Sequence, residues 1–165
     1  NYIITGVTLK LTKKDHKKNI EYGAIKQELE KMQVDEPSIQ DISKAVIVIR
    51  QSKLPDPQEL GNSGSFFKNP VVDQKTFDHF ISRFPEAPYY KMSENQFKIP
   101  AGWLIEQAGF KGKRFGDAGV HKNQASVLVN YGNATGAEIL ELAKRIQETV
   151  EEQFGIFVEP EVNIL

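Results

Sequence analysis

Two residue types at distant points of the chain could carry proton-transfer chemistry. Ser65 lies in "GNSGSFFKNPVV", between a glycine-rich run and two phenylalanines. A serine hydroxyl is a poor acid and a poor nucleophile, so it reacts only where a partner holds its proton or stabilises its alkoxide. Near the C-terminus, Glu159 and Glu161 flank Pro160 in "FVEPEVNIL". Period-two alternation would point both carboxylates to one side of a strand, where one could enter a pocket.

Each of these features also has a purely structural interpretation. Ser65 could belong to a turn that leads into a buried strand. The two glutamates could lie on an exposed edge strand, where their charges would oppose aggregation. A serine hydrolase is disfavoured, because the chain has no G-x-S-x-G motif and its three histidines form no recognisable triad with Ser65.

Basic and glycine-rich segments add weaker candidates for ligand binding. Lys53 in "RQSKLPDP" could bind an anion or lower the cost of an alkoxide, and Arg50 could contact a phosphate, although both could equally be solvated residues at a helix end. Gly112, Gly116 and Gly119 permit close backbone approach to a ligand. No strand–GxGxxG–helix unit surrounds them, so they do not indicate a dinucleotide fold.

The amino-acid composition excludes several kinds of functional site. The chain has 165 residues, a formal charge of −1 and no cysteine. Disulfides, thiolate zinc sites and a cysteine nucleophile are therefore excluded, and we expect no metal site. The weak net charge gives no reason to expect a nucleic acid partner, and no apolar run is long enough to span a membrane. The first residues resemble neither a signal peptide nor a start at Met, so we expect the chain to begin inside a longer protein.

Hydrophobic periodicity predicts mixed secondary structure of the α+β class. We expect a strand over 2–11, a helix within 24–33 and a helix that begins after Ser38. A turn-rich boundary follows at 54–64. Beyond it we expect extended pieces at 65–67 and 71–72, a loop at 111–124, and strands near 96–100, 126–130 and 156–158. Helices are predicted at 73–84, at 101–110 with Gly109 after its end, and at 135–154 with Gly155 at its end.

Three segments together resemble a known family. "KLPDPQELGNSGSFFKNPVV", "PAGWLIEQAGFKGKRFGDAGVHKNQASVLVN" and "FVEPEVNIL" are similar to the C-terminal half of UDP-N-acetylenolpyruvoylglucosamine reductase, also called UDP-N-acetylmuramate dehydrogenase. The resemblance implies a bacterial, cytoplasmic flavoprotein of peptidoglycan precursor synthesis. It implies FAD as cofactor, NADPH as hydride donor, UDP-N-acetylglucosamine enolpyruvate as substrate, and no obligate protein partner.

The resemblance also assigns roles to individual residues. Ser65 matches the serine that protonates the substrate after hydride transfer, and Glu161 matches the glutamate that stabilises or protonates the intermediate. Gly61 and Gly64 would let the backbone bend close to flavin and substrate, with Phe66 and Phe67 as anchors. The remaining matches are a cofactor contact at Arg50 and substrate contacts at Tyr22, Lys53, Asn69, Tyr90, Lys111 and Gln124.

The domain plan and one alternative follow from the same resemblance. Residues 1–54 would be the trailing part of the FAD-binding domain, 55–158 the substrate-binding domain and 159–165 a terminal segment that carries the catalytic glutamate. Asn163 stands where some members have a cationic residue. Because most of the family's FAD domain would lie upstream, we expect this chain alone to bind FAD weakly and to be inactive. The alternative function is a non-catalytic module that binds a UDP-sugar or nucleotide.

Overall fold

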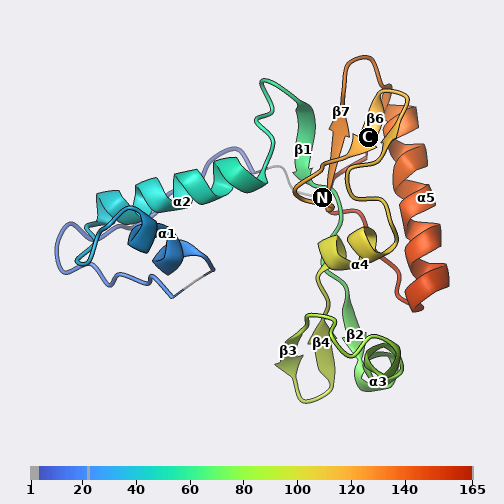
Figure 1. The fold of residues 1–165 in the computed structure, drawn as a ribbon, viewed down its shortest axis with the longest axis horizontal. Coiled ribbons are helices and arrows are strands. Elements are labelled where there is room, and N and C mark those ends of the chain that lie inside the picture. Colours follow the sequence, from blue (N-terminus) through green and yellow to red (C-terminus); the bar gives the residue numbers. More distant parts are fainter. Residues whose placement is uncertain (1–3, 22, 165) are drawn as a thin grey trace. The chain divides into compact units, whose positions relative to one another are not determined.

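The computed structural model describes residues 4–21 and 23–164. The chain divides into two compact units, Asn1–Arg50 and Gln51–Leu165. The structure is a mixture of helices and antiparallel strands (Figure 1), which confirms the α+β class. The assignment of 1–54, 55–158 and 159–165 to reductase domains stays a prediction, since compactness alone does not identify a family domain.

The first unit is built around two helices. Helix α1 spans Ile25–Lys31, within the predicted range, and α2 spans Ile39–Lys53. The Ser38 hydroxyl accepts a hydrogen bond from the Asp41 backbone N–H at 3.2 Å, which caps α2 as predicted. A small core joins the helices through Ile25, Leu29 and Ala45.

The predicted strand over 2–11 is wrong for its described residues. Residues 4–11 have no regular secondary structure, and their apolar side chains Ile4, Val7, Leu9 and Leu11 are exposed. Residues 2 and 3 lie outside the described part. Alternating side chains suit a strand, but a strand also needs a hydrogen-bonded neighbour and a covered face. Within the described residues this segment has neither.

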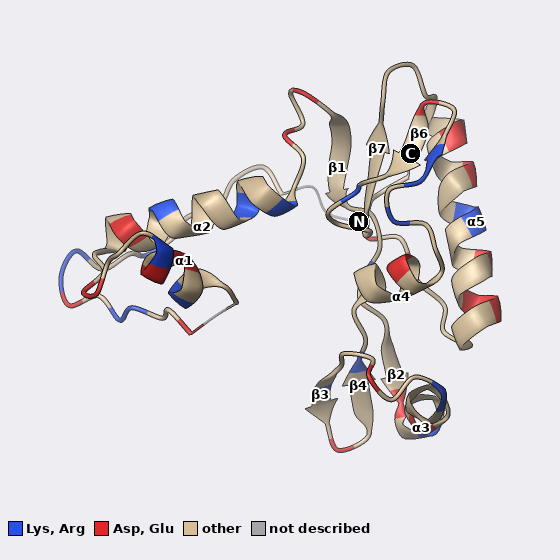
Figure 2. Cartoon of the chain, in the orientation of Figure 1, with Lys and Arg blue, Asp and Glu red and all other residues tan. Residues whose placement is uncertain are grey.

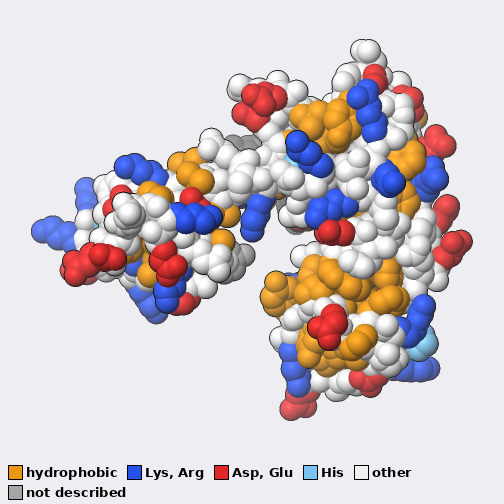
Figure 3. All heavy atoms as spheres, viewed as in Figure 1, with side chains coloured by type: hydrophobic (Ala, Val, Ile, Leu, Met, Phe, Trp, Pro, Cys, Tyr) orange, Lys and Arg blue, Asp and Glu red, His pale blue; other side chains and the backbone are white. Residues whose placement is uncertain are grey.

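The second unit contains two antiparallel sheets. The four-stranded sheet has the order β1-β7-β6-β5, from Gly61–Ser65, Val127–Asn130, Ala118–Val120 and Arg114–Phe115. The three-stranded sheet has the order β2-β4-β3, from Val71–Asp73, Gln96–Lys98 and Tyr90–Ser93. Figure 3 shows hydrophobic side chains gathered over this small sheet and α3, where Val71, Tyr89, Tyr90 and Met92 are exposed.

Three helices complete this unit. They are α3 (Gln74–Arg83), α4 (Ala101–Gln107) and α5 (Gly136–Phe154). Helix α5 lies along the four-stranded sheet (Figure 1), with its charged residues on the outside (Figure 2). Thr135 and Glu138 form a capping box at its start, and Gly155 adopts the left-handed conformation at its end. As predicted, Gly109 has positive φ just after α4.

Two local predictions in the second unit are wrong. Residues 111–124 are not simply a loop, because β5 and β6 pair as a hairpin around Gly116. Residues 156–158 do not form a strand, although Pro160, two residues further on, makes an isolated bridge with Phe67. In each case pairing with a neighbouring segment decides the structure, and such pairing leaves little trace in local periodicity.

His121 is the buried histidine of this unit. It lies directly after β6, its side chain is 7% exposed, and its backbone N–H donates to the Val127 carbonyl at 2.9 Å. The ring Nδ1 has no hydrogen-bond partner within the described residues. Burial, with a smaller effect of nearby Lys122, lowers the pKa of His121, so the ring is neutral at neutral pH.

The lowered pKa predicts a pH-dependent stability. Because the unfolded chain takes up a proton near pH 6.5 while folded His121 resists it, the free energy of unfolding should fall as pH drops from about 7 to about 5. His121→Gln should flatten this dependence in thermal unfolding curves measured across that range. His79→Gln is the matched control, since His79 is exposed on α3. An unchanged slope in His121→Gln would contradict the assignment.

Candidate functional site

Ser65 is placed by an irregularity in strand β1. Asn62 pairs with Val129 and Ser65 with Val127, so β1 holds one residue more than β7 between these pairs. Gly64 absorbs the extra residue with φ +77°, and its N–H donates to Asn62 Oδ1 at 3.0 Å. The bulge re-aims the end of β1.

Glu161 reaches the same place through backbone hydrogen bonds. The Phe66 carbonyl accepts from the Glu161 N–H at 2.8 Å, and the Lys68 N–H donates to the Glu159 carbonyl at 2.9 Å. The residues after Ser65 therefore align with the segment after α5. Phe66 and Phe67 are buried and meet edge to face, with ring centroids 5.1 Å apart. Both rings are therefore fixed in the core next to Ser65, and their role as anchors for its hydroxyl stays a prediction.

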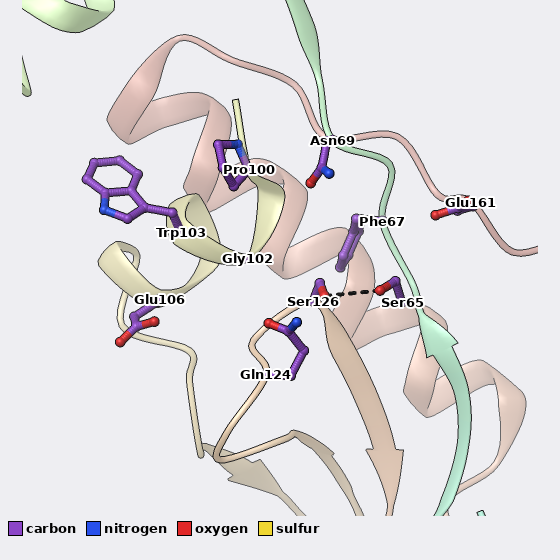
Figure 4. Close-up of a pocket in the computed structure, with 10 residues that line it drawn as sticks. All are labelled: Ser65, Phe67, Asn69, Pro100, Gly102, Trp103, Glu106, Gln124, Ser126 and Glu161. Atoms are coloured by element: carbon purple, nitrogen blue, oxygen red, sulfur yellow. Dashed lines mark hydrogen bonds between the residues drawn. The ribbon is translucent and has the colours of Figure 1, made fainter. Parts of the chain in front are cut away.

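Ser65 and Glu161 line one pocket (Figure 4). Its volume is about 340 Å³, at the lower end of the usual range for small-molecule sites. The pocket also receives Asn69 and Gln124. Asn69 Oδ1 accepts a hydrogen bond from the Ala101 N–H at 2.9 Å, which ties the start of α4 to the segment after β1. The remaining lining residues are Phe67, Pro100, Gly102, Trp103, Glu106 and Ser126.

The polar lining suits a ligand with several hydrogen-bonding groups. Ser65 Oγ lies 3.3 Å from Ser126 Oγ, and either hydroxyl could be the donor. At another point of the wall, Lys111 Nζ pairs with Glu106 Oε1 at 2.7 Å. Lys111 thus bonds to a lining residue without lining the pocket itself. Hydroxyl, amide and carboxylate groups together can exchange protons and orient a polar substrate.

Glu159 does not share the pocket with Glu161. It lines a separate depression with Phe157 and Lys68, and Lys68 Nζ lies 3.3 Å from its carboxylate. The sequence interpretation that strand alternation would point both glutamates to one side is wrong. Within 159–161 only Pro160 makes an isolated bridge, and no continuous strand forms. The alternation of side chains along a strand therefore does not apply here.

The other predicted site residues of the second unit do not line this pocket. Gly61 and Gly64 lie in β1, Lys53 is exposed at the end of α2, and Tyr90 is exposed in β3. Arg50 is exposed and belongs to the first compact unit. Tyr22 lies outside the described residues. The proposed contacts of these residues stay predictions.

Sequence reasoning missed Trp103, Glu106 and Ser126. Trp103 and Glu106 come from α4, whose start is held to the pocket by Asn69. Ser126 was taken only as the first residue of a buried strand, and a local pattern does not reveal that it faces Ser65. Within the described part of the chain, no cluster of His, Asp and Glu could hold a metal ion. No described helix is long and apolar enough to cross a membrane.

Comparison with known proteins gives a consistent set of relatives. Residues 56–165 match the family described as UDP-N-acetylenolpyruvoylglucosamine reductase, C-terminal domain. Proteins named UDP-N-acetylenolpyruvoylglucosamine reductase from Flavobacterium johnsoniae and Chromobacterium violaceum are 63% and 49% identical over 99% of this chain. The chain covers 49% and 48% of these relatives, so it spans about half their length.

One solved structure is also similar. The crystal structure of UDP-N-acetylenolpyruvylglucosamine reductase (MurB) from Thermus caldophilus aligns with 78% of this chain and 36% of that chain, at 25% identity and a TM-score of 0.43.

The geometry of β1 yields a prediction about Gly64. Gly64→Ala should destabilise the fold by about 1–2 kcal/mol, because a Cβ strains the left-handed conformation that the bulge requires. Urea unfolding of the purified chain measures this loss. Gly136→Ala is the matched control: Gly136 begins α5, has ordinary φ and has open space around a new Cβ, so alanine should be neutral or stabilise by up to about 1 kcal/mol. Equal effects of the two substitutions would show that the bulge carries no strain.

Proposed function

The chain belongs to the family of the UDP-N-acetylenolpyruvoylglucosamine reductase C-terminal domain, and from this premise we propose that it supplies the proton-transfer site of such a reductase. The substrate would be UDP-N-acetylglucosamine enolpyruvate, reduced to UDP-N-acetylmuramate for peptidoglycan synthesis. One observation carries the proposal: Ser65 and Glu161, far apart in the sequence, line one pocket. A module that only binds a nucleotide sugar has no need for both groups there.

The proposed reaction needs a hydride and a proton. When bound, FAD reduced by NADPH supplies the hydride to the methylene carbon of the enolpyruvyl group. The electrons of the carbon–carbon double bond then move to the carbon that bears the carboxylate. Ser65 Oγ–H gives its proton to that carbon. Overall the substrate gains a hydride and a proton, and NADPH becomes NADP⁺.

Other residues would stabilise the intermediate and bind the substrate. Glu161 stabilises or protonates the intermediate. Asn69 and Gln124 offer side-chain amides to the polar substrate, and Lys111 holds Glu106 in the wall. Lys53 and Tyr90 would bind the diphosphate and uridine, and Tyr22 would fold over the UDP-sugar. Preorganised polar groups of this kind lower the cost of developing charge in a transition state.

The flavin fits this arrangement at one point. At Gly64, beside Ser65, no atom lies within 4 Å of the position that a Cβ would occupy. Open space there allows a flat ring to approach the backbone. Arg50 would contact the flavin in the assembled protein. We propose that the rest of the FAD site belongs to the half of a reductase that this chain does not span, and that the protein works in the bacterial cytoplasm.

Substitution of Ser65 tests the proposed chemistry. This chain can replace the matching half of the Flavobacterium johnsoniae reductase, and stopped-flow absorbance can follow flavin reduction and reoxidation separately. In this chimera, Ser65→Ala should leave flavin reduction by NADPH intact. Reoxidation by the enolpyruvyl substrate should slow by about 100- to 10,000-fold, since a general acid contributes that much. Glu161→Gln should slow the same step.

Ser63→Ala is the matched control, because Ser63 is an exposed serine two residues earlier in the same strand. It should keep the full rate. Full activity in Ser65→Ala would contradict the role of the hydroxyl. An inactive chimera that still binds the UDP-sugar would favour the non-catalytic binding module.

The chain by itself should not carry the complete reaction. We expect the purified chain to bind far less than about one FAD per chain, judged by its flavin absorbance, and to show no turnover with NADPH and substrate. A yellow protein with turnover would contradict the proposal that FAD is held mainly by the other half of the reductase.

A further inference from the structure

We propose that Ser126 is a positioning residue for Ser65: its hydroxyl donates a hydrogen bond to Ser65 Oγ, which leaves the Ser65 proton free to face the substrate and stabilises the alkoxide that forms. This inference rests on the proposed function, and it adds a residue to the proton-transfer site.

The backbone fixes the contact between the two serines. Their Oγ atoms lie 3.3 Å apart (Figure 4), across the junction of β1 and β7. The Phe66 N–H donates to the Ser126 carbonyl at 2.7 Å, and Ser65 pairs in register with Val127. Main-chain pairing thus holds the backbone at both serines, which keeps the two side chains within reach of each other.

Burial restricts what the Ser126 hydroxyl can do. Ser126 is 7% exposed, whereas Ser65 is exposed at the pocket. A buried hydroxyl is expected to have a hydrogen-bond partner, and Ser65 Oγ is such a partner. Ser126 is therefore held against Ser65, while Ser65 keeps a side open to the pocket.

The direction of this hydrogen bond decides whether Ser65 can act as an acid. If Ser65 donates to Ser126, its proton points into the sheet and away from the substrate. If Ser126 donates, Ser65 Oγ is an acceptor and its own proton is free to point into the pocket. Only the second arrangement is productive, and a bound ligand that accepts the Ser65 proton would select it.

The same hydrogen bond strengthens during the reaction. As Ser65 protonates the substrate, its O–H bond breaks, the new C–H bond forms with the electron pair left on carbon by hydride addition, and the negative charge stays on Ser65 Oγ. The Ser126 O–H then donates to an alkoxide, and a charged hydrogen bond of this type is shorter and stronger than a neutral one. Ser65 afterwards recovers a proton from solvent at its exposed side.

Ser126→Ala in the chimera tests this role. Alanine keeps the Cβ at the buried position directly before β7 and removes only the hydroxyl, so the fold should be retained. Flavin reoxidation by the substrate should slow by about 10- to 100-fold, the effect of losing a charge-assisted hydrogen bond. The solvent deuterium isotope effect on that step should rise, because proton transfer becomes more rate-limiting. Flavin reduction by NADPH and the substrate Kd should not change.

Two further measurements separate a chemical role from a structural one. Ser126→Thr keeps the hydroxyl and should restore most of the lost rate. In the purified chain, a thermal unfolding cycle of Ser65→Ala, Ser126→Ala and the double variant reports the hydrogen bond without any activity. The double variant should lose less than the sum of the single losses.

The outcomes distinguish this inference from the proposed function. An inactive wild-type chimera would contradict the reductase function and this inference with it. An active chimera whose Ser126→Ala variant keeps the wild-type rate and isotope effect would contradict only the role of Ser126. A raised Kd with an unchanged reoxidation rate would also contradict it, since Ser126 would then serve binding. Strictly additive losses in the unfolding cycle would remove the hydrogen bond on which the inference depends.

Discussion

The peptide groups around Phe66 join three segments of the chain, and the pocket depends on this junction. The Phe66 N–H donates to Ser126 at the start of β7, and its carbonyl accepts from Glu161 near the C-terminus. One residue thus brings the hydroxyls of Ser65 and Ser126 and the carboxylate of Glu161 to the same cavity. Buried peptide groups must be paired, so breaking this junction would also leave polar groups unsatisfied.

The hydrophobic core holds the junction in place. The Phe66 and Phe67 side chains are buried in a cluster that includes residues of β6, β7, α4 and α5. One wall of the pocket is held by a hydrogen bond. Asn69 accepts it from the first residue of α4 and so fixes the helix that carries Trp103 and Glu106. The polar groups of the site are therefore held by backbone hydrogen bonds and by the buried core, as positioned proton transfer requires.

The charge of the site is modest, which bears on its chemistry. The ionisable lining residues are Glu106 and Glu161, and Glu106 is paired with Lys111. A transferred proton that starts from a neutral hydroxyl leaves an anion behind, and a neighbouring hydroxyl donor stabilises that anion without an added permanent charge. Ser126, directly before β7, provides this donor through its side-chain hydroxyl, 3.3 Å from Ser65 Oγ.

Local sequence patterns determined the helices of this chain. The apolar spacing and caps of 74–83, 101–107 and 136–154 specify helices because these signals act between near neighbours. Motif resemblance also singled out Ser65 and Glu161. The strands were harder: residues 4–11 alternate without pairing, whereas 114–120 pair despite their glycines. Strand formation needs a partner segment, and periodicity contains no information about where that partner lies.

Only the tertiary structure decided which side chains share the pocket. It brought Asn69 and Gln124 together with Ser65 and Glu161, separated Glu159 from Glu161, and placed Ser126 against Ser65. The physical reason is that these contacts depend on strand register and on hydrogen bonds between distant peptide groups. A shift of one residue in the pairing of β1 with β7 would turn Ser65 to the other face of the sheet, while the amino-acid sequence would still show the same motif.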